Sequence, residues 1–144
     1  MKPVRRIVCA DGPDGKSKAV HDGPAPVRTD PARPGFSSAF IWATDTTPAR
    51  IEGNPPRVLA PPPGGSLCRI VTFPPDRDGA RFVQRTRTLD FCVVLEGRIT
   101  LVLDTEEVQL KAGDTVVQRG TSHAWSNRSD APCVIAISSH DATG

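Results

Sequence analysis

Residues 88–103 read TLDFCVVLEGRITLVL and contain two apolar runs separated only by Glu96 and Gly97. Both runs are rich in Val, Ile, Leu and Thr, and β-branched residues favour strands. A short break that contains glycine between two such runs is typical of a hairpin turn. This stretch therefore predicts two β-strands joined by a tight turn at Glu96 and Gly97.

Similar apolar runs occur on both sides of this stretch. One precedes it at residues 67–73 (LCRIVTF) and stops at two prolines. Four more follow it, each bounded by turn-forming residues, at 108–111, 115–118, 124–127 and 133–138. Short strands at such regular spacing indicate an all-β sandwich or barrel. No segment has a convincing helical period, and fifteen prolines and twelve glycines disfavour long helices.

Strand alternation predicts which side chains meet inside such a fold, because successive residues of a strand point to opposite faces. If Asp90 points inward, Cys92 shares its face and Phe91 faces outward. On a later strand, His123 and Trp125 share one face. Asp90 and His123 can therefore both point into the interior of such a fold.

The first half of the chain has a different composition. Residues 1–65 are rich in Pro, Gly, Asp and Ala, and their short apolar pieces at 4–9, 19–20 and 38–44 each predict a short strand. Residues 54–65 (NPPRVLAPPPGG) form a spacer that cannot be helical. We expect residues 1–65 to be an N-terminal arm that packs on a barrel formed by residues 66–144, or on a partner subunit. A partly disordered leader is the alternative, and burial of the apolar pieces favours the ordered arm.

Charge and cysteine content narrow the classes of function. The 144 residues include 18 basic and 16 acidic ones, and a net charge of +2 is too weak to indicate a nucleic-acid or membrane partner. The four cysteines show neither a CxxC pair nor zinc-ligand spacing. The N-terminus lacks the apolar run of a secretory signal, and no run is long enough to cross a bilayer. A cytoplasmic location with free thiols is the simplest interpretation.

Residues 113–127 read GDTVVQRGTSHAWSN and carry a family resemblance. A Gly-Asp pair, a strand, a turn, His123 and, four residues later, Asn127 resemble the second sequence motif of the cupins. The end of the first cupin motif is also matched, by Asp90 and the strand that ends at Gly97. The resemblance implies a cupin-type double-stranded β-helix (jelly-roll) barrel with an extended N-terminal arm and a ligand pocket near His123.

The first motif departs from the family pattern upstream of Asp90. Cupins usually carry two histidines there, but residues 83–86 read VQRT, and Gln84 stands where related small cupins have a histidine. Any metal would have to use His123, Asp90 and Gln84. One imidazole, one carboxylate and one amide are a weak ligand set for a transition metal, because non-heme iron prefers two histidines and a carboxylate. We therefore assign no cofactor with certainty and allow a divalent metal only at low occupancy.

Without a metal, His123 can still act as a general acid or base, with Asp90 orienting its ring or holding its charge. This chemistry suits a lyase, isomerase, cyclase or decarboxylase acting on a small organic substrate. The alternative is a cupin that has lost its metal site and only binds a small ligand. Cupin barrels commonly form dimers through edge strands and arms, so the resemblance also implies a homodimer.

Four further side chains are candidates for substrate binding. Gln84, Arg69 and Arg85 can hold a carboxylate or carbonyl, the arginines through their planar guanidinium groups. Trp125 either forms a pocket wall that stacks on a planar ligand or fills the core. Asn127 fits a hydrogen-bonding role in a turn better than a catalytic one.

Overall fold

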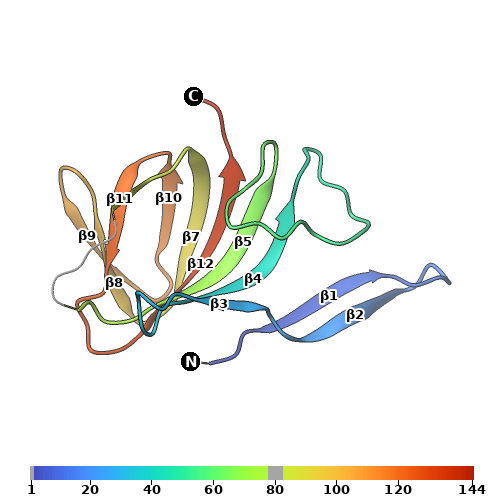
Figure 1. Cartoon of the computed structure of the whole chain (residues 1–144), viewed down its shortest axis with the longest axis horizontal. Helices are drawn as coiled ribbons and strands as arrows, with labels where there is room; N and C mark the ends of the chain where they lie inside the picture. Colours follow the sequence, from blue (N-terminus) through green and yellow to red (C-terminus); the bar gives the residue numbers. More distant parts are fainter. Residues whose placement is uncertain (1, 78–82) are drawn as a thin grey trace.

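The computed structural model describes residues 2–77 and 83–144, and these residues form twelve β-strands and no helix (Figure 1). This confirms the predicted all-β fold. The strands are β1 Arg5–Asp11, β2 Ser17–Pro24, β3 Val27–Thr29, β4 Ser37–Thr44, β5 Ser66–Phe73, β6 Val83–Arg85, β7 Thr88–Glu96, β8 Arg98–Val102, β9 Glu107–Lys111, β10 Thr115–Arg119, β11 Ser122–Ser126 and β12 Cys133–Asp141.

Two antiparallel sheets form the body of the molecule. One has six strands in the order β10-β7-β12-β5-β4-β3, and the other has four in the order β6-β11-β8-β9. The four-stranded sheet lies at the left of Figure 1, beside β10 and β7 of the larger sheet. The arrangement is a jelly roll of two antiparallel sheets, the fold that the resemblance implies.

The hydrophobic core fills the space between the two sheets. Its centre is made by residues that are 5% exposed or less, among them Val94 from β7, Ile99 from β8 and Ile135 from β12. Strand β7 shows the predicted alternation, because Asp90 and Cys92 are buried while its odd-numbered side chains from Phe91 onward are exposed. Both sheets thus contribute one apolar face to a shared interior.

The predicted hairpin at Glu96 and Gly97 is wrong. Strand β7 pairs with β10 and β12, whereas β8 pairs with β9 and β11, so the chain crosses from one sheet to the other at this point. Gly97 has a φ of 84°, and a Cβ placed there would lie 2.6 Å from the carbonyl oxygen of Pro132. The crossing therefore needs a residue without a side chain. Glycine at a sheet corner and glycine in a hairpin turn look alike in sequence.

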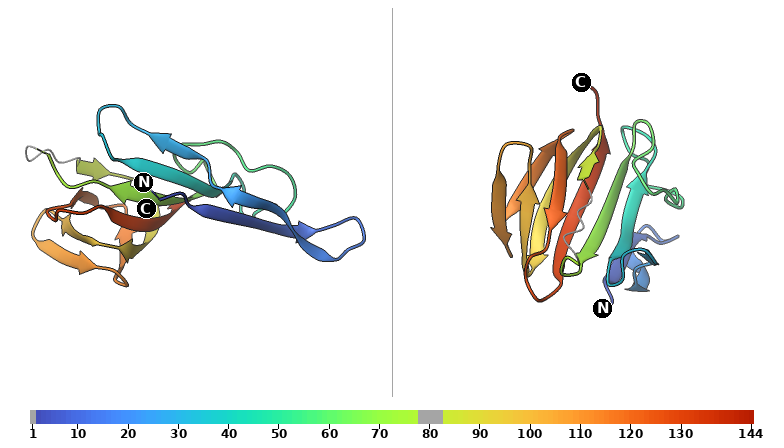
Figure 2. Two further views of the ribbon diagram at one scale, coloured as in Figure 1. Left: turned by 90° about the horizontal axis from the view of Figure 1, so that it is seen from below. Right: turned by 60° about the vertical axis from the view of Figure 1, so that its left-hand side comes forward.

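The first 44 residues divide into two parts. Strand β4 pairs with β5 along its length, and β3 forms the outer edge of the six-stranded sheet. Strands β1 and β2 pair only with each other and form a hairpin that extends away from the body (Figures 1 and 2). Apolar side chains of this hairpin are not buried, since Ile7 and Val20 are 50% and 52% exposed.

Candidate functional site

A cavity of about 260 Å³ lies between the two sheets, and both contribute residues to its wall. Side chains from β5, β7, β11 and β12 form most of the lining, and the segments around residues 33–36 and 59–61 complete it. The cavity has room for a small organic molecule. Five of the predicted site residues line it, namely Arg69, Gln84, Asp90, His123 and Trp125.

His123 is held in one defined orientation. Its ring is 4% exposed on β11, and Nδ1 lies 2.9 Å from the carbonyl oxygen of Thr121. A carbonyl can only accept, so Nδ1 donates, and Nε2 of the neutral ring is left as an acceptor. The ring meets Trp125 edge-on, with centroids 6.0 Å apart and an interplanar angle of 80°. His123 therefore presents a basic nitrogen from a fixed ring.

Gln118 supports this orientation from outside the cavity. It is 2% exposed on β10, and the hydroxyl of Thr121 donates a hydrogen bond to its Oε1. Gln118 also faces Asp90 across the β10–β7 pair. Gln118 is thus linked to His123 through Thr121 and lies opposite Asp90. The sequence offered no signal for it, because an isolated glutamine in a short strand is usually a surface residue.

Asp90 and Arg69 each hold a buried polar atom without a partner. Asp90 is 6% exposed, and neither its Oδ1 nor the Nε of Arg69 makes a hydrogen bond. Burial lowers the pKa of Arg69, and the Asp90 carboxyl partly opposes this effect. Buried polar groups normally have partners, so an acceptor and a donor left open in one cavity indicate a site for a polar ligand.

Arg85 does not join the other predicted residues. It is exposed and is absent from the cavity wall, whereas its neighbour Gln84 reaches the cavity. The two residues sit opposite Ser122 and His123 in the β6–β11 pair. Adjacent residues of a strand point to opposite faces, so only one of them can face the interior.

Several lining residues were missed by sequence reasoning. Phe36 packs edge-on against Phe73, with ring centroids 5.7 Å apart, and the guanidinium of Arg33 lies 4.3 Å from the Phe36 ring centroid. Leu59 comes from the proline-rich segment that the sequence marks only as a spacer. Nothing in its composition says which surface such a segment covers.

Cys92 also lines the cavity, beside Asp90 on β7. Burial, followed by the nearby Asp90 carboxyl, raises the pKa of the Cys92 thiol to about 12. The thiol is therefore protonated at neutral pH and is neither a nucleophile nor a ready metal ligand.

Comparison with known proteins places this architecture in a family. Residues 69–139 match the Cupin domain family. The whole fold resembles the putative ethanolamine utilization protein q of Salmonella typhimurium, with a TM-score of 0.55, 16% identity and coverage of 99% of this chain and 100% of that one. It also resembles the cupin domain of Schizosaccharomyces pombe Cnp3, with a TM-score of 0.59, 10% identity and coverage of 96% and 88%. The fold and the match define a cupin domain. The chain therefore contains a cupin domain at residues 69–139.

Its curated relatives are fungal. Phomopsin biosynthesis cluster protein C' of Diaporthe leptostromiformis is 43% identical over 101 residues, which cover 62% of this chain and 52% of that protein. The cupin-domain-containing oxidoreductase fogC of Aspergillus ruber is 37% identical over 98 residues, covering 62% and 47%. Oryzines biosynthesis cluster protein J of Aspergillus oryzae is 29% identical over 140 residues, covering 88% and 75%. The chain spans about half the length of the first two.

The cavity residues do not fit the metal that many cupins hold. Within residues 2–77 and 83–144, no three His, Cys, Asp or Glu side chains are grouped as a metal site. His123 is the one histidine among the residues lining the cavity. Gln84 is exposed, and its amide oxygen is a weak donor for iron, nickel or zinc. The chemistry of the cavity therefore rests on its side chains. Residues 2–77 and 83–144 contain no helix that is long and apolar enough to span a membrane.

Proposed function

We propose that this protein catalyses proton transfer on a small organic molecule, with His123 as general acid and base. The observation that carries the proposal is the hydrogen bond from Nδ1 to the Thr121 carbonyl. It fixes the tautomer whose Nε2 can accept a proton, and the ring lies in the wall of a cavity of ligand size. A neutral imidazole takes a proton readily near neutral pH, and the imidazolium then returns it to another atom of the substrate.

Asp90 and Arg69 have complementary roles in this scheme. The open Oδ1 of Asp90 accepts a hydrogen bond from a substrate hydroxyl, or stabilises the imidazolium once His123 has taken a proton. The open Nε of Arg69 donates to a substrate oxygen and stabilises the negative charge that develops on it. A base, an acceptor and a cationic donor around one cavity suit an isomerase, lyase, cyclase or decarboxylase.

The names of the curated relatives support a role in making small molecules. Two are biosynthesis cluster proteins, and a third is named as an oxidoreductase. Proton transfer needs only the side chains in the cavity wall. Proton transfer is therefore the step that these residues can perform by themselves.

Hydrogen exchange tests the proposal without knowledge of the natural substrate. The protein is incubated in D₂O with a panel of small ketones and 2-oxo acids, and NMR follows deuterium entry at the carbon next to the carbonyl. The wild type is expected to accelerate exchange for at least one compound, and His123→Gln to lower that rate by about 10²–10⁴-fold. The exchange rate of Asp90→Asn tests the role of the Asp90 carboxylate in the same way.

His140→Gln is the matched control. His140 contacts Phe91 and lies 3.0 Å from the hydroxyl of Ser138, outside the set of residues that line the cavity. The His140→Gln variant should therefore exchange hydrogen at the wild-type rate. Equal rates for wild type and His123→Gln would refute the mechanism and favour a module that only binds its ligand.

A further inference from the structure

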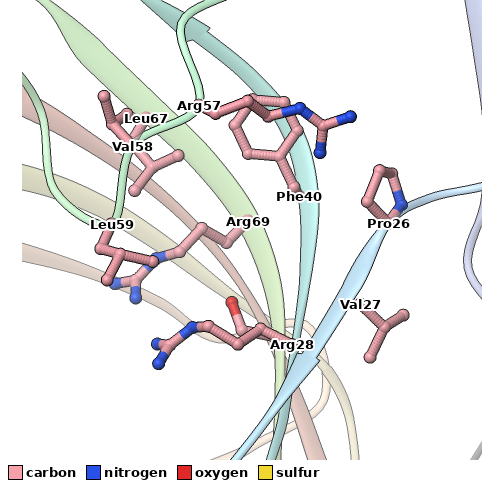
Figure 3. Close-up of a pocket in the computed structure, with 10 residues that line it drawn as sticks. Pro26, Val27, Arg28, Phe40, Arg57, Val58, Leu59, Leu67 and Arg69 are labelled. Carbon is pink, nitrogen blue, oxygen red and sulfur yellow. The ribbon is translucent and has the colours of Figure 1, made fainter.

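A second cavity adjoins the first one on the six-stranded sheet (Figure 3). Its volume is about 240 Å³, and its wall comes from residues 26–28, from β4, from residues 57–59 and from the start of β5. We call it the arginine groove. The groove and the His123 cavity share three lining residues, Leu59, Leu67 and Arg69. Arg69 therefore stands at the boundary between the two spaces.

The charge of the groove is entirely positive. Arg28, Arg57 and Arg69 line it, and among the residues that the structure describes no acidic one does. None of the three forms an ion pair with a carboxylate in the described part of the chain. Arg28 is close enough for its charge to contribute to the lowered pKa of Arg69. Figure 3 shows the guanidinium groups of Arg28 and Arg69 ending on the same side of the groove, near Leu59.

Arg28 is exposed and has no ion pair among the described residues, and the counter-charge of Arg69, the Asp90 carboxyl, lines the other cavity. The Nε of Arg69 is also buried without a hydrogen-bond partner. An anion bound between the Arg28 and Arg69 guanidinium groups would offset the charge of both in the groove, while the Arg69 Nε stays available to the His123 cavity. The planar guanidinium matches the two oxygens of a carboxylate.

The remaining wall of the groove is apolar. Phe40, Val58 and Leu67 contribute to it, and the Arg57 guanidinium lies 5.6 Å from the Phe40 ring centroid. Leu59 is 71% exposed although it stands between the two cavities. Exposed apolar side chains next to unpaired cations fit a ligand that has an anionic end and an apolar body.

We propose that the arginine groove binds the carboxylate of an apolar organic acid, with Arg28 and Arg69 holding the carboxylate and Leu59 and Leu67 covering the adjoining body. The inference rests on the proposed function, because the reactive carbon of the same molecule then lies on the other side of Arg69, in the His123 cavity. The substrate class becomes a carboxylate whose reacting atom is separated from the acid group by an apolar segment.

Calorimetric titration of the whole chain tests this inference. The probes are 4-phenylbutyrate, its neutral analogue 4-phenylbutanol, phenyl phosphate and inorganic phosphate. We expect the carboxylate to bind at least about tenfold more tightly than the alcohol, and Arg28→Gln to weaken it by about tenfold. Arg57→Gln is a second variant on a different segment of the wall, with a loss of a few-fold expected. Arg98→Gln, an exposed change on β8 outside both cavities, keeps the wild-type affinity.

Several outcomes would overturn the assignment. These are no binding of 4-phenylbutyrate at about 1 mM, equal binding of the alcohol, tighter binding of either phosphate, or full affinity in both groove variants. A wrong assignment of the arginine groove can be distinguished from a wrong assignment of His123 as the acid and base. His123→Gln should still bind 4-phenylbutyrate although it loses hydrogen exchange. If Arg28→Gln binds normally and exchange still depends on His123, only the groove assignment fails.

Discussion

Replacing Gly97 with alanine should destabilise the fold strongly, because this residue carries the chain from one sheet to the other. Its φ of 84° lies in the left-handed region, which costs an L-residue about 1–2 kcal/mol. The added Cβ would lie 2.6 Å from the Pro132 oxygen and 3.1 Å from Cys133 Cα. Both are backbone atoms that cannot rotate away, so overpacking adds about 1–3 kcal/mol. The stiffer unfolded chain returns about 0.4–1 kcal/mol. The expected loss of unfolding free energy is about 1–5 kcal/mol with a central value of about 3 kcal/mol, by adding these contributions.

Gly113→Ala is the matched control. Its φ of 95° is also left-handed, but nothing lies within 4 Å of the added Cβ. Only the backbone strain remains, and the expected loss is about 1 kcal/mol. Urea unfolding followed by tryptophan fluorescence measures both variants, and an unchanged m-value shows that the midpoints report stability. Equal losses in the two variants would refute the close packing of Gly97 against Pro132, and with it this explanation of the crossing.

Three further predictions concern other parts of the molecule. Asn127→Ala removes four side-chain hydrogen bonds from a residue that is 1% exposed. Urea unfolding should show that the free energy of unfolding falls by about 3–4 kcal/mol. A fall of less than about 1 kcal/mol would contradict the structural role of these hydrogen bonds. Burial raises the pKa of the Cys92 thiol from its ordinary 9.0 to about 12. Between these two pH values the native protein therefore keeps the thiol proton, whereas the unfolded chain releases it. The free energy of unfolding should therefore fall as pH rises from about 9 to 12, and it should fall less steeply in Cys92→Ala. At pH 8, Ellman's reagent should label the exposed Cys9 but not the buried Cys92. We also predict a homodimer that covers the apolar side chains of the β1–β2 hairpin; Ile7→Glu with Val20→Glu should shift it toward monomer in light scattering, and a wild-type monomer would count against it.

Local residue patterns predicted ten of the twelve strands and the inner face of β7, but not the short strands β3 and β6. Val, Ile and Thr favour extended backbone, and side chains alternate strictly along it, so the burial of Asp90 and Cys92 and the exposure of Phe91 follow from the order of residues alone. The strands and their faces depend on neighbours in sequence, and a linear pattern contains that information. The pocket near His123 was instead implied by the resemblance of residues 113–127 to the second cupin motif.

Tertiary structure alone decided which strands pair and which distant side chains share a cavity. Glu96 and Gly97 have the local chemistry of a hairpin, yet β7 and β8 belong to different sheets, because pairing depends on the packing of all the strands. The proline-rich segment gave no sign that Leu59 would line both cavities. Arg28 and Arg69 are 41 positions apart in the printed sequence, and only the pairing of β3 with β4 and of β4 with β5 places them in one groove. Sequence spacing carries no information about such a meeting, since it depends on how the whole sheet folds.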